Sequence, residues 1–161
     1  MPIKSFRGMI QEDQVETVSL HTNTGSIGYK IKSLKIMPVD TGGATNTANE
    51  ATIQIFTIPN TATAQAGLTH ASIDFSDQTL IGVAYFLRDQ GVVAVTSETI
   101  IFDNVTFNQD VYIVYKDSQT NNIGMNWHME LEQVKLDINE NTVATLKDIR
   151  NIESQWVNSF T

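Results

Sequence analysis

MNWHMELEQVKLDI, residues 125–138, is the stretch of sequence that decides the fold. Its apolar residues alternate with polar residues as far as Leu131, and the alternation resumes at Val134 after a shift of one residue. Alternation with a period of two predicts a β-strand with one buried face and one solvent-facing face. The shift predicts a β-bulge between Glu132 and Gln133, because a bulge returns the apolar residues to the same face.

A shorter stretch, residues 29–36, repeats this pattern and predicts a second bulged strand. Tyr29 and Ile31 take the buried phase, and the phase then shifts at Lys32 and Ser33. Two long bulged strands in one chain favour a curved antiparallel sheet.

Further short apolar runs bring the expected number of strands to about eight. These runs are residues 15–20, 52–58, 80–87, 92–95, 99–102 and 111–115. We expect residues 60–72 to form a long polar loop and residues 117–124 to form a hairpin loop. The pattern predicts an all-β fold, an antiparallel β-sandwich of jelly-roll type, although immunoglobulin-like connections use a similar number of strands.

The expected organisation is an N-terminal arm over residues 1–13, a β-sandwich domain over 14–138, a short helix over 139–153 and a C-terminal tail over 154–161. The helix is predicted from apolar residues at helical spacing. The N-terminal segment has no clear apolar period, so a free tail and an arm that docks on a neighbour both remain open.

Apolar side chains near the two ends of the chain need cover, either from their own sheet or from a neighbouring subunit. The candidate partner-binding residues are Ile3, Phe6, Met9, Ile10, Trp156, Val157 and Phe160. Two predicted strands, residues 80–87 and 111–115, are apolar on both faces, although a sandwich buries only one face of each sheet. Long loops or the terminal helix could cover the second face, but we expect a symmetric oligomer to do so.

Composition excludes several classes of protein. The chain has 161 residues and no cysteine, so it has neither a disulfide scaffold nor a thiolate metal site. Its formal net charge of −8 argues against a nucleic-acid partner, and no apolar run is long enough to span a bilayer. Charged residues make up 17% of the chain, which is below the roughly 25% usual for globular domains.

The sequence carries no motif for catalysis that we recognise. Glycine-rich phosphate loops, HExxH and GxSxG are all absent. The three histidines, His21, His70 and His128, are far apart in sequence and are expected on the surface. We therefore expect a non-enzyme without catalytic residues, metal ligands or cofactors.

The sequence offers one candidate pair of catalytic carboxylates. Glu130 and Glu132 lie two residues apart on one strand, which places them roughly 7 Å from each other. That separation is compatible with glycoside hydrolysis. Both glutamates nevertheless lie on the polar phase of a strand that also carries Lys135, which favours a solvated or lysine-paired face.

Two other polar groups permit a binding role. A basic stripe on one predicted strand is expected to pair with Glu130 and Glu132 across the sheet, with an acidic neighbour as the alternative. The stripe consists of Lys30, Lys32 and Lys35. A set of oxygen-bearing residues could hold calcium, but Asx turns explain the same residues. The set consists of Asp103, Asn104, Asn108 and Asp110.

Three segments together resemble small structural proteins of tailed bacteriophages, particularly those of marine and cyanobacterial hosts. The segments are ETVSLHTNTGSIGYKI, TIIFDNVTFNQDVYIVYKD and MELEQVKLDINENTVATLKDIRNIE, and the resemblance covers most of residues 14–153. It implies a β-sandwich or jelly-roll module that serves as a capsid decoration or cement protein, a head fibre, or a neck or tail part. It implies no catalytic residues.

We therefore expect a non-enzymatic virion structural protein, a decoration protein at the capsid surface. Its expected partners are further copies of itself, in a homotrimer, and a major capsid protein or another virion protein. A neck or tail component and a carbohydrate-binding or receptor-binding module of the virion are the alternatives. Removal of residues 154–161 is expected to leave folding intact and to weaken attachment to the particle.

Overall fold

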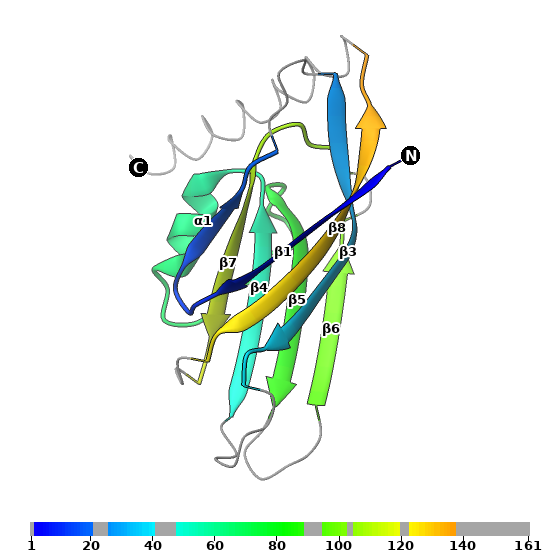
Figure 1. Ribbon diagram of the computed structural model, residues 1–161. Coiled ribbons are helices and arrows are strands. Elements are labelled where there is room, and N and C mark those ends of the chain that lie inside the picture. Colours follow the sequence, from blue (N-terminus) through cyan, green and yellow to red (C-terminus); the bar gives the residue numbers. More distant parts are fainter. Residues whose placement is uncertain are drawn as a thin grey trace, which may run out of the picture.

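The computed structural model describes residues 2–20, 26–40, 48–88, 95–102, 105–119 and 123–137. Within these residues, eight strands form two antiparallel sheets that pack face to face, and one helix lies against one of them (Figure 1). The elements are β1 (Ile3–Ile10), β2 (Val15–Val18), β3 (Ile27–Pro38), β4 (Asn49–Phe56), α1 (Pro59–Ala66), β5 (Leu80–Arg88), β6 (Val95–Ile101), β7 (Val111–Asp117) and β8 (Met125–Lys135).

The strand order is that of a jelly roll with one strand moved. Sheet A has the order β1-β8-β3, and sheet B has the order β2-β7-β4-β5-β6. A jelly roll wraps an antiparallel ribbon in which the first strand pairs with the eighth, the second with the seventh, the third with the sixth and the fourth with the fifth. Three of these pairs are hydrogen-bonded here, whereas β6 bonds to β5 and only packs against β3. The expected all-β jelly-roll sandwich is confirmed.

One apolar core fills the space between the two sheets. Both sheets supply fully or almost fully buried side chains, and each such side chain contributes about 1.5–3 kcal/mol through removal from water. Examples are Leu34, Met129 and Leu131 from sheet A and Ile53, Ile55, Ile113 and Tyr115 from sheet B. This core explains the alternation that predicted β8, because its apolar residues face sheet B.

The bulge predicted in residues 29–36 is confirmed. The pairing of β3 with β8 shifts between Ile31 and Ser33, so that Lys32 is the extra residue. Tyr29, Ile31 and Leu34 are all buried, as the shifted alternation predicted.

The second predicted bulge, in β8, is wrong. Glu132 and Gln133 pair with successive residues of β3 without a shift in register. The extra residue of this ladder lies in β3, so β8 needs none of its own. Val134, which the predicted bulge returned to the core, is only partly buried.

The segment predicted as an N-terminal arm is a strand. Residues 3–10 form β1, which pairs with β8 along its whole length. Ile10 is buried in the core and Phe6 packs against it, whereas Gly8 interrupts the apolar alternation that would have predicted the strand. This segment is therefore an edge strand of sheet A, and neither a free tail nor a docking arm.

The predicted loop over residues 60–72 begins with a helix. Pro59 occupies the first turn of α1, where its missing N–H costs nothing, and Gly67 follows the last turn. Ala62 is fully buried against the outer face of sheet B, in a cluster with Phe56, Leu80 and Val114. The helix therefore covers the outer face of β7, one of the two strands that are apolar on both sides and for which the sequence predicts cover by an oligomer.

Two further predictions differ from the structure. Residues 117–124 do not form a hairpin loop, because β7 belongs to sheet B and β8 to sheet A. Of the two short strands predicted over 92–102, the structure describes one strand, β6.

The predicted C-terminal helix and tail, residues 139–161, lie outside the described residues. In the part of the chain that is described, no helix is long and apolar enough to cross a membrane.

Candidate functional site

The outer face of sheet A presents its side chains in rows across three strands. The register pairs each outward residue of β8 with one outward residue of β1 and one of β3. Side chains that lie opposite each other in this way have Cβ atoms about 4.5–5.5 Å apart. Successive rows follow every second residue, at a spacing of roughly 7 Å. The sheet therefore fixes the relative positions of residues that are far apart in sequence.

One of these rows is cationic. Arg7 of β1 and Lys35 of β3 flank His128 of β8, which lies opposite both of them. Among the described residues, neither Arg7 nor Lys35 has a carboxylate within salt-bridge distance. We call these three residues the cationic row. The two charged side chains lie on either side of β8, so the row is a local concentration of positive charge on a chain whose net charge is −8.

An exposed apolar patch lies beside the cationic row. Met9 of β1 and Met37 of β3 both pair with Asn126, and their side chains are 49% and 61% exposed. Val39 follows β3 and is also exposed, and its side chain approaches that of Met9 over Gly124. We call Met9, Met37 and Val39 the apolar patch. Exposed apolar side chains that gather at one place are typical of contact surfaces.

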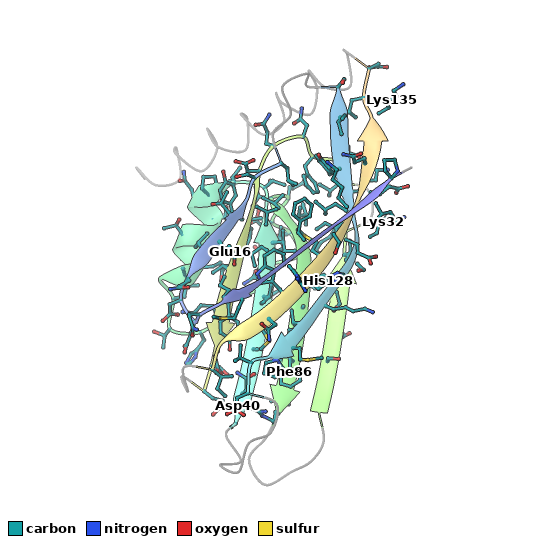
Figure 2. All side chains as sticks on the ribbon, viewed as in Figure 1. Glu16, Lys32, Asp40, Phe86, His128 and Lys135 are labelled. Atoms are coloured by element: carbon teal, nitrogen blue, oxygen red, sulfur yellow. The ribbon has the colours of Figure 1, made fainter. Side chains whose placement is uncertain are left out.

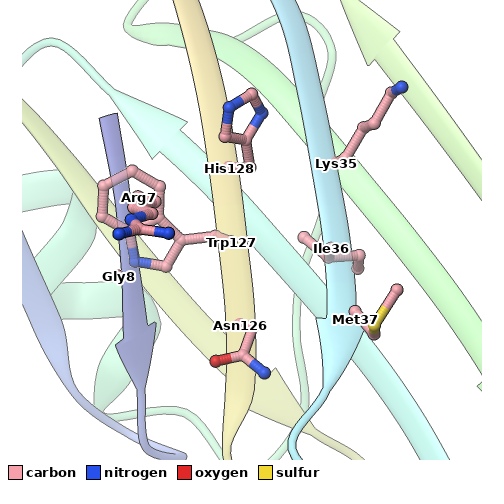
Figure 3. Close-up of a pocket in the computed structure, with 8 residues that line it drawn as sticks. All are labelled: Arg7, Gly8, Lys35, Ile36, Met37, Asn126, Trp127 and His128. Atoms are coloured by element: carbon pink, nitrogen blue, oxygen red, sulfur yellow. The ribbon is translucent and has the colours of Figure 1, made fainter. Parts of the chain in front are cut away.

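A groove of about 620 Å³ joins parts of these two features (Figure 3). It crosses all three strands of sheet A. Its lining comprises the cationic row, Met37 and Asn126, together with Gly8, Ile36 and Trp127. The groove thus combines two permanent cations, an imidazole, an amide and apolar surface within one small area.

The indole of Trp127 supports the groove from below. Its ring passes beneath β1 at Gly8, where an added Cβ would lie 3.0 Å from the ring. Its Nε1–H donates a hydrogen bond of 3.1 Å to Glu16 of β2, which joins sheet A to sheet B. Figure 2 shows His128 on β8 of sheet A and Glu16 on β2 of sheet B. Because Trp127 is only 4% exposed, it does not offer a flat aromatic surface to a ligand.

On this face, His128 is hydrogen-bonded to a serine of the neighbouring strand. Its Nε2 lies 2.7 Å from the hydroxyl oxygen of Ser5, one row further along β1. A serine and a histidine at this distance are also the first two parts of a hydrolytic triad. Here both side chains lie on an open sheet face, and among the described residues no carboxylate is hydrogen-bonded to the imidazole. The contact therefore fixes the orientation of the ring in the cationic row.

The structure distributes the predicted partner-binding residues unevenly. Ile3 and Met9 are exposed on the outer face of sheet A, and only Met9 belongs to the apolar patch. Phe6 is half-buried and Ile10 is buried in the core, so neither presents a contact surface. The other predicted residues, Trp156, Val157 and Phe160, lie outside the described residues.

The predicted basic stripe is divided by the structure. Lys32 forms a salt bridge of 3.4 Å with Glu132, as expected, and Lys30 lies opposite the same glutamate. Lys35 lies opposite His128 and not opposite a glutamate. Glu130 lies in the next row, between two serines. These glutamates are thus on the solvent-facing side of the sheet and do not line the groove.

The other predicted polar sites are dispersed. Of the histidines, His70 is exposed and His21 lies outside the described residues. Of the calcium set, Asp103 and Asn104 also lie outside the described residues. Asp110 accepts a hydrogen bond of 2.8 Å from the backbone N–H of Leu20, which is a structural role. Among the described residues, no group of three potential metal ligands gathers.

Sequence reasoning missed most of the groove. Arg7 lies in the segment that the sequence predicts as an arm, and no sequence pattern indicates a binding role for Met37 or Val39. Lys35 had been singled out as part of the basic stripe, but its neighbours across the sheet depend on a register between strands that are far apart in sequence. That register was not available from the sequence pattern. The outward phase of each strand was the one signal that pointed to these residues.

Comparison with known proteins adds no family. No protein-family model matches the sequence, and no curated protein is detectably similar to it.

Proposed function

We propose that this protein is a non-enzymatic structural protein of a tailed-bacteriophage particle, a decoration protein that binds the head and stabilises it. The observation that carries the proposal is the outer face of sheet A, where the apolar patch adjoins the cationic row. Exposed apolar and unneutralised charged groups on a sheet supported by a full core suit contact with another protein. The resemblance of the sequence to phage structural proteins supplies the biological setting.

The proposal includes two partners, namely further copies of the chain in a homotrimer and the major capsid protein. On sheet B, α1 covers the outer face of β7, and the connection from α1 to β5 exposes Leu68, Ile73 and Phe75. The outer face of sheet A is the better candidate for contact with the capsid, because it combines exposed apolar side chains with the cationic row. The location implied is the surface of the virion head.

The alternatives receive less support. A carbohydrate-binding module needs a flat, exposed aromatic surface, but Trp127 is buried and its Nε1–H is occupied by Glu16. Phe75 is 54% exposed, but it packs edge-on against Phe102 on the other sheet, away from the groove. A neck or tail component would present the same kind of contact face. The two roles differ in the number of copies per particle, because neck and tail parts form small rings whereas decoration proteins cover the whole shell.

Quantitative mass spectrometry of purified particles tests the proposed function. We expect the protein in every preparation, at a fixed and high ratio to the major capsid protein. A ratio that corresponds to a single ring would favour the neck or tail alternative. Absence from particles, in infections where the protein is produced, would contradict a virion role altogether.

A further inference from the structure

We propose that the cationic row and the apolar patch together bind an acidic segment of a partner protein, with one carboxylate seated over the cationic row and one apolar side chain on the patch. This inference deepens the proposed function because it names the chemistry that the capsid partner offers. It is tested on the purified protein alone, so it can fail while the virion role stands.

The charge of the cationic row favours an anionic ligand. Arg7 and Lys35 are permanently cationic at neutral pH, and they face each other across His128 without a carboxylate partner among the described residues. An anion placed between them would relieve their repulsion and accept charge-assisted hydrogen bonds from both. Asn126, in the adjoining row, can both donate and accept a hydrogen bond, which suits a peptide group.

The positive region is small. Glu130 lies in the row beyond the cationic row, and Glu132 lies one row further, where it pairs with Lys32. Negative charge therefore resumes within roughly 7 Å of His128. The positive region has room for one or two carboxylates and not for a long polyanion.

The pattern of charge and apolar surface favours a protein segment over a nucleic acid. A nucleic acid would place phosphates along the whole face, and several of them would meet the two glutamates and a chain of net charge −8. The apolar patch would also be left uncovered by phosphates. An acidic peptide segment satisfies both features, because neighbouring side chains can differ in polarity.

The spacing of the two features matches that of an extended peptide. The apolar patch and the cationic row are successive rows of one sheet, so they are separated by roughly 7 Å. An extended segment that lies along β8 repeats its side-chain direction at the same interval. The partner is therefore expected to carry an apolar residue and an acidic residue two positions apart. The groove of about 620 Å³ accommodates side chains of this kind.

The test uses a display library of short random peptides, selected on the purified protein. Two double variants are compared with the native chain. Arg7→Gln with Lys35→Gln removes both permanent charges of the cationic row. Lys4→Gln with Lys135→Gln removes the same total charge from exposed positions of β1 and β8 outside the groove. All changed side chains are exposed, so thermal unfolding should show that every variant keeps its fold.

We expect the enriched peptides to carry an acidic residue and an apolar residue two positions apart. Their affinity should fall about tenfold in the variant of the cationic row and stay within about twofold in the matched control. Peptides that bind both variants equally, or a library that yields no enrichment, would overturn the inference. A single-stranded oligonucleotide that binds the native chain more tightly than the selected peptides, and competes with them, would also overturn it.

Discussion

At the scale of single residues, a buried lysine makes polar contacts with three other residues. Lys116 of β7 is 2% exposed, and its ammonium group contacts the carboxylate of Asp13 and the carbonyl oxygens of Ala66 and Leu68. These carbonyls belong to the last turn of α1 and its continuation, where the helix dipole favours a cation. One side chain therefore ties α1 and the turn after β1 to sheet B.

Replacing this lysine should destabilise the protein. Lys116→Met keeps the length of the side chain but leaves two carbonyl oxygens without their donor, and we expect a loss of about 2–4 kcal/mol in the free energy of unfolding. Urea denaturation followed by circular dichroism measures the change. The control is Lys4→Met on the exposed part of β1, which should change stability by less than about 0.5 kcal/mol. Equal stability of the two variants would show that the buried contacts of Lys116 do not contribute to the free energy of unfolding.

A buried tyrosine should make the protein sensitive to alkali. Burial raises the pKa of the Tyr115 hydroxyl well above its ordinary value, and the neighbouring carboxylate of Asp117 adds to this effect. The hydroxyl donates a hydrogen bond of 2.8 Å to the carbonyl of Ile123 and accepts one of 3.2 Å from Asn49. The folded chain therefore holds a proton that the unfolded chain releases above a pH of about 10.

The sign of the pH dependence follows from this difference. Stability is fully present below a pH of about 10 and falls as the pH rises above it, because the unfolded state then binds fewer protons. Chemical denaturation between neutral and strongly alkaline pH should show the decline. In Tyr115→Phe the decline should be shallower, and not absent, since burial also raises the pKa of Tyr85 and Tyr112. An identical slope in both proteins would refute the assignment to Tyr115.

At the scale of elements, β1 depends on one glycine. A Cβ at Gly8 would lie 3.0 Å from both the Trp127 ring and the carboxylate of Glu16, so the close approach of β1 to β8 and β2 requires a residue without a side chain. The same glycine interrupts the apolar alternation of this segment, which explains why the strand was not predicted. Gly8 therefore allows β1 to pack closely and also removes the apolar pattern from which the strand could have been predicted.

Filling this space should disturb the link between the sheets. Gly8→Val is expected to cost about 1–3 kcal/mol, because the added methyl groups displace Trp127 and stretch its hydrogen bond to Glu16. Tryptophan fluorescence should change in the same variant. The matched control is Gly67→Ala after α1, where an added Cβ would have ordinary contacts of 3.6 Å or more. Native fluorescence and stability in Gly8→Val would contradict the described packing.

At the scale of the whole molecule, the sequence predicted most of the fold and little of the contact surface. Strands with clear alternation, such as residues 125–131, and the bulge at Lys32 could be read directly because each depends on local pattern. Helix α1 could not, since it buries only Ala62 and shows no apolar period. Pro59 at its start and Gly67 at its end were the signals available.

The missed helix also altered a conclusion about assembly. Strands β5 and β7 were predicted to need an oligomer because both of their faces are apolar, but α1 covers the outer face of β7. The groove on sheet A was beyond prediction for another reason. It joins residues from β1, β3 and β8, and only the long-range register of the sheet brings them together.

The two ends of the chain are expected to respond differently to truncation. Removing residues 1–10 should abolish soluble, folded protein, because it removes Ile10 from the core and leaves the edge of β8 unpaired. Removing residues 154–161 should leave the fold intact, as the sequence predicts. Circular dichroism and thermal unfolding of both truncated chains decide the matter. A stably folded chain without residues 1–10 would mean that β1 is dispensable.

The most direct test of the whole account is rebinding to particles. Virions produced without this protein are mixed with the native chain, with the Arg7→Gln and Lys35→Gln double variant, or with the Lys4→Gln and Lys135→Gln control, and bound copies are counted by cryo-electron microscopy and quantitative mass spectrometry. We predict saturable binding over the head surface by the native chain and the control, and binding about tenfold weaker by the variant of the cationic row. Failure of the native chain to bind heads, or equal occupancy by all three proteins, would contradict the account.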